Sequence, residues 1–222
     1  AMGEILRAEL AAHGFAGKLL LCGDHEIALA GAMQTLGCVL IAGTGSICYG
    51  KNAAGEHFRC GGGGHIIDDP GSGYALGRDA LAAALQTEDG RLSENALHGA
   101  VMDTVGGSGI QGIFDFVYFS RRGKGDIAAL APLVLRCAAQ GDAVSLDILR
   151  RGAAELARLV SAVMGKLGLE NGSPCALAGG LLAEDNVYRR AVCAALAPFC
   201  RPAAPEHDAL FGAVQLALAA IQ

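Results

Sequence analysis

Leu40-Ile41-Ala42-Gly43-Thr44-Gly45-Ser46-Ile47 is an apolar run that ends in a glycine-rich turn. Glycine tolerates positive φ and has no Cβ to keep a ligand away from the backbone. Amide groups in this turn can therefore point at an anion, beside the hydroxyls of Thr44 and Ser46. The turn matches neither the G-x-x-x-x-G-K-[ST] phosphate loop nor the G-x-G-x-x-G motif. A tight hairpin between two strands would use Gly-x-Gly equally well, so the turn alone leaves both interpretations open.

Strands and helices are predicted on both sides of this turn. Three strands are predicted in close succession at 38–42, 47–50 and 57–60, followed by the glycine run 61–64 and a polar loop. Further short apolar runs predict strands at 18–22, 175–178 and 199–201. Apolar residues at helical spacing predict helices at 4–13, 26–35, 74–85, 94–105, 110–119, 126–140, 143–167, 187–196 and 209–221.

The composition is that of a globular protein with a large core. The chain has 222 residues, of which 52% are hydrophobic, and a net charge of −5. No block of basic residues is present, so a nucleic-acid partner is not expected. No apolar run reaches membrane-spanning length and no signal peptide is recognisable, so a cytoplasmic protein without a membrane partner is predicted. The eight cysteines show no C-x-x-C spacing, which favours buried free thiols over a metal site.

Asp24 is the first candidate for chemistry. It follows the predicted strand 18–22 and precedes an alanine-rich helix. A carboxylate between a strand and a helix lies at the carboxyl edge of a sheet, where α/β proteins bind their ligands. An N-cap role at the start of the helix would also explain an aspartate here, and both roles can coexist.

Five motifs follow one another along the chain: Gly23-Asp24, Gly43-Thr44-Gly45-Ser46, Gly61-Gly62-Gly63-Gly64-His65, Asp69 with Gly71-Ser72-Gly73-Tyr74, and Ala178-Gly179-Gly180. In this order and spacing they resemble the BadF/BadG/BcrA/BcrD ATPase family, and within it the N-acetylglucosamine kinase and glucosamine kinase branch. The resemblance runs from about Lys18 to the C-terminus. The order of elements also resembles the second lobe of the actin-like ATPase (ribonuclease H-like) fold, an α/β fold whose mixed sheet is flanked by helices.

The resemblance implies an ATP-dependent kinase that transfers the γ-phosphoryl group to a hydroxyl of an amino sugar, with Mg²⁺. Asp24 would be the catalytic base and would contact the sugar. No residue is assigned as a metal ligand, since the histidines lack a spacing such as H-E-x-x-H. The implied ATP-binding residues are Gly43, Thr44, Gly45, Ser46, Gly179 and Gly180. The implied sugar-binding residues are Asp24, Gly45, Gly64, His65 and Asp69.

Two departures from the family pattern leave the sugar undetermined between glucosamine and N-acetylglucosamine. The family typically reads Gly-Gly-Trp-Gly-His where this chain has Gly63 in place of the tryptophan. It also typically reads Gly-Asp-Glu-Gly-Ser where this chain has Asp68 and Pro70 in place of the glycine and the glutamate. Asp68 would favour a sugar with a free ammonium group, or it is a solvated loop carboxylate.

The start of the chain departs further. The family opens with a first lobe whose Asp-Gly-Gly-Gly-Thr hairpin holds the phosphates and Mg²⁺, and residues 1–23 contain no such segment. We therefore expect residues 1–36 to be a remnant of the first lobe and residues 37–222 to be the C-terminal lobe. Such a chain is expected to be inactive by itself. It is also expected to form a homo-oligomer, most simply a dimer, because apolar surface normally covered by the first lobe is exposed.

Two other functions fit the same family resemblance. One is an ATPase that activates a dehydratase or a reductase, although the scattered cysteines argue against the iron–sulfur cluster of those branches. The other is a non-catalytic sugar-binding module.

Overall fold

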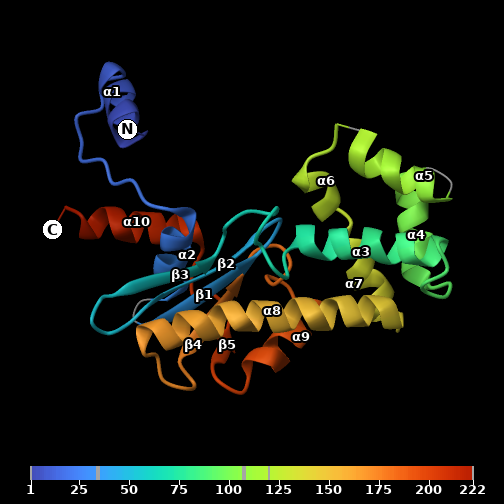
Figure 1. Ribbon diagram of the computed structural model, residues 1–222. Helices are drawn as coiled ribbons and strands as arrows, with labels where there is room; N and C mark the ends of the chain where they lie inside the picture. The colour runs from blue at the N-terminus through green and yellow to red at the C-terminus, as the bar shows by residue number, and fades with distance from the viewer. Residues whose placement is uncertain (1, 34–35, 107–108, 120, 222) are drawn as a thin grey trace.

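The computed structural model describes residues 2–33, 36–106, 109–119 and 121–221. Its centre is one five-stranded mixed sheet in the order β3-β2-β1-β4-β5 (Figure 1). β1, β2 and β3 pair antiparallel, whereas β4 pairs parallel with both β1 and β5. The carboxyl ends of β1, β4 and β5 therefore lie at one edge. The strands are β1 Gly37–Ala42, β2 Ser46–Lys51, β3 His57–Gly61, β4 Pro174–Ala178 and β5 Arg201–Ala203.

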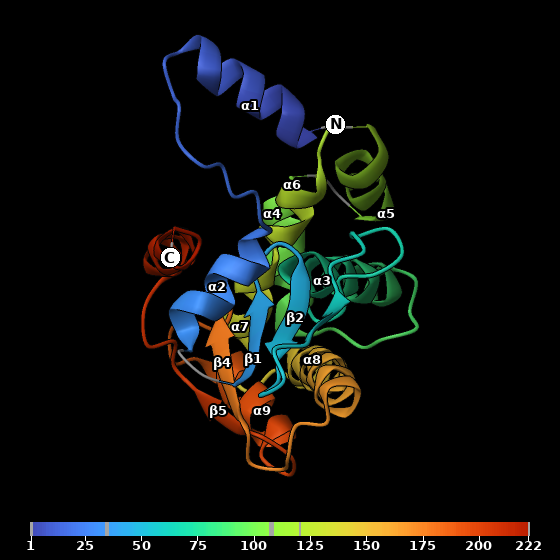
Figure 2. The same ribbon diagram turned by 90° about the vertical axis from the view of Figure 1, so that its left-hand side faces the viewer.

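Helices cover both faces of the sheet (Figure 2). One face carries α8 (Ala143–Leu167) and α9 (Val187–Leu196), and the other carries α2 (Asp24–Ala32) and α10 (Ala209–Ala219). The period-2 alternation of β1 explains this, because Leu40 belongs to the large core on the α8 side while Val39 belongs to a smaller core under α2. The predicted α/β fold with a mixed sheet flanked by helices is confirmed.

The remaining helices gather at one end of the sheet, beside α3, while α1 lies apart from the sheet (Figures 1 and 2). On α3 the predicted apolar stripe is buried at Leu76, Ala80, Leu81 and Ala84. This helix begins at the polar loop after β3, so its burial anchors that loop to the core. These elements are α1 Met2–Ala12, α3 Gly73–Glu88, α4 Ala96–Val105, α5 Gly109–Phe114, the π-helix η1 Asp115–Phe119, α6 Lys124–Ala128 and α7 Ala131–Ala139.

The predicted strand at 18–22 is wrong. Residues 18–22 lie outside every helix and strand, Leu20 and Leu21 are 49% and 55% exposed, and the segment pairs with no strand in the part of the chain that the structure describes. Lys18 Nζ instead donates to the carbonyl of Ala220. A strand needs a neighbour to receive its backbone hydrogen bonds, and an apolar run cannot reveal whether one is present.

Several other boundaries also differ from the prediction. The helix predicted at 126–140 is two helices, α6 and α7, because Pro132 stands in the first turn of α7, where its missing N–H costs least. The last strand begins at Arg201, because the amides of Phe199 and Cys200 still bond to Leu196 at the end of α9. α2 starts at Asp24, two residues before the prediction; residues 34 and 35, which the prediction included, lie outside the described residues.

The described residues contain no single helix that is both long and apolar enough to cross a membrane. Only the segment Lys124–Ala139 and α8, taken together, have the necessary length and composition, and they are bent by 118° relative to one another. The apolar residues of α8 are part of the buried core of the protein.

Candidate active site

The glycine-rich turn connects β1 to β2 at the carboxyl edge of the sheet. Gly43 N–H donates to the carbonyl of Gly45 (2.9 Å), which closes the turn. The carbonyls of Gly43 and Thr44 accept from the amides of Gly73 (2.7 Å) and Tyr74 (3.2 Å). The turn is therefore a hairpin, and it is also held against the first turn of α3.

Asp69 lies directly beside this turn. Its side chain is buried, and it is the only non-glycine residue with positive φ (57°) among the described residues. The amide of Ser46 donates to Asp69 Oδ1 (3.4 Å), and Ser46 Oγ donates to the carbonyl of Pro70 (2.6 Å). A Cβ added at Gly45 would lie 2.9 Å from Asp69 Oδ2. Glycine at position 45 is thus required for the buried carboxylate to approach the turn.

Tyr188 on α9 anchors the loop that carries Asp69. Tyr188 is fully buried, and its hydroxyl donates to the carbonyl of Gly71 (2.7 Å). Burial raises the pKa of the Tyr188 phenol, so the hydroxyl stays protonated and can donate.

We expect Tyr188→Phe to lower the free energy of unfolding by about 1–3 kcal/mol, because it leaves the buried carbonyl of Gly71 without a donor. Urea denaturation measures the change. Tyr118→Phe is the matched control, since the Tyr118 side chain is 74% exposed, and should change stability by less than about 0.5 kcal/mol. Equal effects of the two substitutions would contradict the assigned role of the hydrogen bond.

Asp24 is the first residue of α2, the helix that packs on the sheet face opposite α8. Gly23 is the N-cap of this helix, and its amide donates to Glu26 Oε1 (2.9 Å). The alternative N-cap role of Asp24 is therefore wrong, because Gly23 and Glu26 already fill it. Asp24 Oδ1 accepts from the amide of His25 (2.8 Å), and the Asp24 side chain is 95% exposed. Its carboxylate is available to a ligand.

One cavity of about 450 Å³ brings most of the expected site residues together. Its walls include Asp24, the turn 43–46, Gly64 and Asp69. Two cationic side chains also line it, Arg59 and Lys124. Arg59 was not expected from the sequence, because an exposed arginine on a strand carries no motif. The remaining lining residues are His25, Ile41, Ile47 and Gly62.

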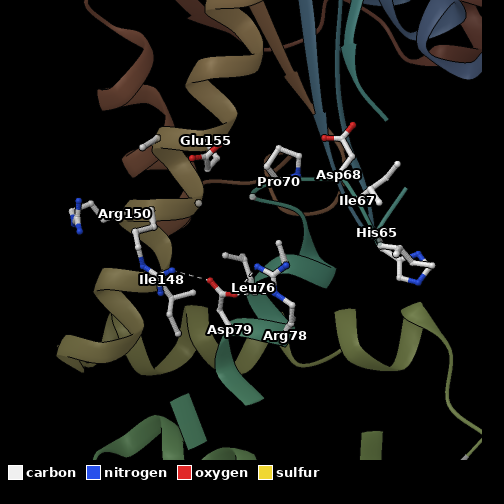
Figure 3. Close-up of a pocket in the computed structure, with 16 residues that line it drawn as sticks. His65, Ile67, Asp68, Pro70, Leu76, Arg78, Asp79, Ile148, Arg150 and Glu155 are labelled. Atoms are coloured by element: carbon white, nitrogen blue, oxygen red, sulfur yellow. Dashed lines mark hydrogen bonds and ion pairs between the residues drawn. The ribbon is translucent and has the colours of Figure 1, made fainter. Parts of the chain in front are cut away.

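His65 lies elsewhere. It lines a separate cavity of about 610 Å³ between the 65–71 loop, α3 and α8, and its ring packs edge-on against Tyr74 with centroids 4.7 Å apart. Figure 3 shows this cavity, with the ring of His65 pointing away from Arg150 and Glu155. The structure therefore does not bring His65 to the cavity that contains Asp24, and its contact with the sugar stays a prediction.

Gly179 and Gly180 follow β4 at the same edge of the sheet as the turn. Gly179 has φ +87°, and a Cβ there would lie 2.4 Å from the carbonyl oxygen of Ala42. That carbonyl accepts from the amide of Leu181 (3.1 Å). Gly180 is exposed with open space around its Cα. The pair lies beside the end of β1 but outside the 450 Å³ cavity, so its contact with ATP stays a prediction.

Comparison with known proteins identifies the family. The family model described as the BadF/BadG/BcrA/BcrD ATPase family matches residues 4–217. The chain belongs to this family. The resemblance inferred from the motifs is confirmed, and membership of an ATPase family implies the use of ATP.

Two curated relatives of this BadF/BadG/BcrA/BcrD ATPase family member are sugar kinases by name. The N-acetylmuramic acid/N-acetylglucosamine kinase of Clostridium acetobutylicum is 41% identical over 159 residues, which cover 71% of this chain and 52% of that protein. The N-acetyl-D-glucosamine kinase of Dictyostelium discoideum is 31% identical over 174 residues, which cover 76% and 53%. The chain therefore spans about half the length of these relatives.

Two solved structures share the fold. A candidate N-acetylglucosamine kinase from Chromobacterium violaceum superposes with a TM-score of 0.75 at 32% identity, over 95% of this chain and 70% of that one. A second candidate N-acetylglucosamine kinase, from Porphyromonas gingivalis, gives a TM-score of 0.64 at 19% identity, over 86% and 62%. The second likeness supports the fold alone.

The two departures from the pattern of the BadF/BadG/BcrA/BcrD ATPase family contact each other. Gly63 N–H donates to Asp68 Oδ2 (2.8 Å), and a Cβ at Gly63 would lie 2.7 Å from the same oxygen. The Asp68 carboxylate thus occupies the space that a side chain at position 63 would need. Asp68 is partly exposed and bonded within the loop, so both interpretations of this carboxylate, as a partner of a sugar ammonium group and as a solvated loop residue, stay predictions.

Proposed function

We propose that this chain is part of an ATP-dependent amino-sugar kinase, which transfers the γ-phosphoryl group of ATP to a hydroxyl of the sugar. The observation that supports this most strongly is the single cavity that holds the exposed carboxylate of Asp24, the turn 43–46 and the buried Asp69. The names of the curated relatives support N-acetylglucosamine or N-acetylmuramic acid as the sugar.

Each group has a distinct role in the proposed reaction. The Asp24 carboxylate accepts the proton of the attacking hydroxyl, and Asp69 accepts a hydrogen bond from another hydroxyl and orients the ring. The sugar oxygen then bonds to the γ-phosphorus while the bond from that phosphorus to the β-phosphate oxygen breaks, and ADP leaves. The backbone of the turn 43–46 faces the phosphates.

Mg²⁺ would be held mainly by the phosphates. No group of three or more His, Cys, Asp or Glu side chains among the described residues is placed to hold a metal ion. This fits Mg²⁺, which keeps several waters and binds through substrate phosphates and one or two carboxylates. The ion would supply positive charge to the transferred group, and Asp24 is the exposed carboxylate of the cavity that could approach it.

The alternative of an ATPase that activates a dehydratase or a reductase has no support from the cysteines. All eight are free thiols. Cys38, Cys48, Cys175 and Cys200 belong to the buried core, where the first three are at most 1% exposed and Cys200 is 4% exposed. They are packed as small apolar residues, away from the surface where a second subunit could share a cluster.

We propose the division of the chain that the motifs suggested. Residues 37–222 form the second lobe of the kinase and residues 1–36 belong to the first. The position of α1 away from the sheet supports this division (Figure 1), as does the coverage of about half of each curated relative. Full phosphoryl transfer then requires the remainder of the first lobe.

Two measurements on the chain test the function. Isothermal titration calorimetry with N-acetylglucosamine, N-acetylmuramic acid and glucosamine should show saturable binding of at least one sugar, and no binding of any would overturn the proposal. A coupled ADP-release assay with ATP and Mg²⁺ should show sugar-dependent turnover when a first lobe from a relative is added. Fast turnover by the chain alone would contradict the division into lobes and leave the kinase assignment intact.

Self-association of the isolated chain is a separate expectation. Leu210 and Val214 on α10 are 76% and 55% exposed, Ile221 just after this helix is 72% exposed, and Leu20 and Leu21 are also exposed. Exposed apolar surface of this kind favours association. We expect a dimer or a larger species by light scattering, and a monomer across the micromolar range would contradict this.

A further inference from the structure

None of the residues to which the proposed reaction assigns a role carries a positive charge. Asp24 and Asp69 bring two carboxylates into the cavity, and the turn 43–46 contributes glycines and hydroxyls. Phosphoryl transfer, however, relies on positive charge around the transferred group, and two carboxylates would repel a polyphosphate. The two cationic side chains on the same walls, Arg59 and Lys124, balance these carboxylates. We propose that Arg59 and Lys124 bind the phosphate groups of the nucleotide; the identity of the anion as a nucleotide rests on the proposed kinase function.

Arg59 is placed by the pairing of β3 with β2. It lies directly opposite Tyr49, whose side chain is on the α2 side of the sheet. Cross-strand partners share a face, so Arg59 is on the same side as Asp24. Cys60 packs against the core on the opposite face of the sheet, and Gly61 and Gly62, which follow it, have no side chains that could screen Arg59.

The guanidinium of Arg59 has no competing partner in the described ranges 2–33, 36–106, 109–119 and 121–221: it makes no hydrogen bond and no ion pair there. Its planar array of donors matches the oxygens of a phosphate group and can bind them in pairs.

Lys124 is placed by the packing of α6 on α3. Lys124 and Ala128 are four residues apart and so lie on one face of α6. A Cβ at Gly73 would lie 3.5 Å from the Cβ of Ala128, and the amide of Gly73 donates to the carbonyl of Gly43. The face of α6 that carries Lys124 is therefore next to the glycine-rich turn. The ammonium group of Lys124 likewise makes no hydrogen bond and no ion pair with any residue in the part of the chain that the structure describes.

The larger cavity is a poorer place for phosphates, although three arginines line it. Arg78 pairs with Asp79 (2.8 Å), Arg151 also pairs with Asp79 (3.1 Å), and Arg150 pairs with Asp147 (2.6 Å). Each of these arginines is already paired with a carboxylate. An anion would have to displace those partners, whereas Arg59 and Lys124 are available.

Calorimetric titration of the whole chain with ATP and with inorganic tripolyphosphate, at low salt without Mg²⁺, tests the proposal. We expect both ligands to bind, and Arg59→Gln and Lys124→Gln each to weaken both by about tenfold, the amount typical of a charge-assisted hydrogen bond. Arg78→Gln and Lys166→Gln are matched controls outside the cavity and should change the affinity less than about twofold. Circular dichroism verifies that each variant is folded.

The outcomes separate this inference from the proposed function. No saturable binding of either ligand by the unmodified chain, or equal affinities in the site variants and the controls, would overturn the inference. If the two site variants weaken N-acetylmuramic acid but not ATP, the cations serve a sugar carboxylate and the inference is also wrong. If the variants weaken both phosphate ligands while no sugar binds to the chain, the phosphate site stands and the kinase proposal fails.

Discussion

Asp24→Asn should lower the rate of sugar-dependent phosphoryl transfer by about 10² to 10⁴, the range typical of the loss of a general base. Asparagine has nearly the same shape as aspartate but cannot accept the proton of the attacking hydroxyl. The substitution should leave the fold intact, because Gly23 and Glu26 cap α2 and the Asp24 side chain is 95% exposed. The ADP-release assay in the reconstituted protein measures the rate, and calorimetry measures the sugar affinity.

The change is expected in turnover more than in sugar binding, because the proton is transferred only in the reaction. Asp185→Asn is the control: this carboxylate is 73% exposed and pairs with Arg190 outside the cavity. Turnover of Asp24→Asn within a factor of two of the unmodified protein would exclude Asp24 as the base. A loss of sugar binding as large as the loss of turnover would make Asp24 a sugar ligand alone.

Gly212→Ala should detach α10 from α2 and lower the free energy of unfolding by about 1–3 kcal/mol, the usual cost of forcing extra atoms into a packed contact. A Cβ at Gly212 would lie 1.9 Å from the carbonyl oxygen of Ile27, and one at Gly31 would lie 2.0 Å from that of Asp208. The obstacles are backbone atoms, which cannot rotate away as a flexible side chain can. The two helices must therefore move apart.

Gly99→Ala in α4 is the matched control, because Gly99 is exposed in a helix and a Cβ there meets nothing within 4 Å. Alanine favours the helix there, so this variant should gain about 0.5–1 kcal/mol. Urea denaturation compares the two, and hydrogen exchange should rise over α10 in Gly212→Ala only. The close contact would be disproved by equal shifts of the two variants.

Local patterns predicted most of the fold. The bounds of α8 and α9 were predicted to the residue, since α8 starts at the Asp142 cap and ends before Gly168 in the left-handed conformation. The prediction of a strand at 18–22 was wrong, because an apolar run carries no information about a pairing partner. The prediction of one helix at 126–140 was wrong at Pro132, although a proline inside a helical pattern is a recognisable signal for a helix boundary.

The candidate site also contains residues that the sequence placed correctly and one that it did not. The motifs named Asp24, the turn 43–46 and Asp69 as residue types suited to phosphoryl transfer, and the fold brings these residues to one cavity. His65 follows the glycine run in the chain but faces another cavity, because the loop turns between residues 65 and 69. Residues that are close in sequence, such as His65 and Asp69, can thus line different cavities when the backbone reverses direction between them.

The order of strands and helices, the glycine turn and the family were readable from the chain, because periodicity, caps and short motifs are local. The position of Arg59 and Lys124 near the turn could not be predicted from the sequence, because it depends on the β2–β3 register and on the packing of α6 against α3. The contact between Gly63 and Asp68 is likewise a property of the folded loop. Charge balance in a cavity is set by side chains that are distant in sequence, so only the tertiary structure decides it.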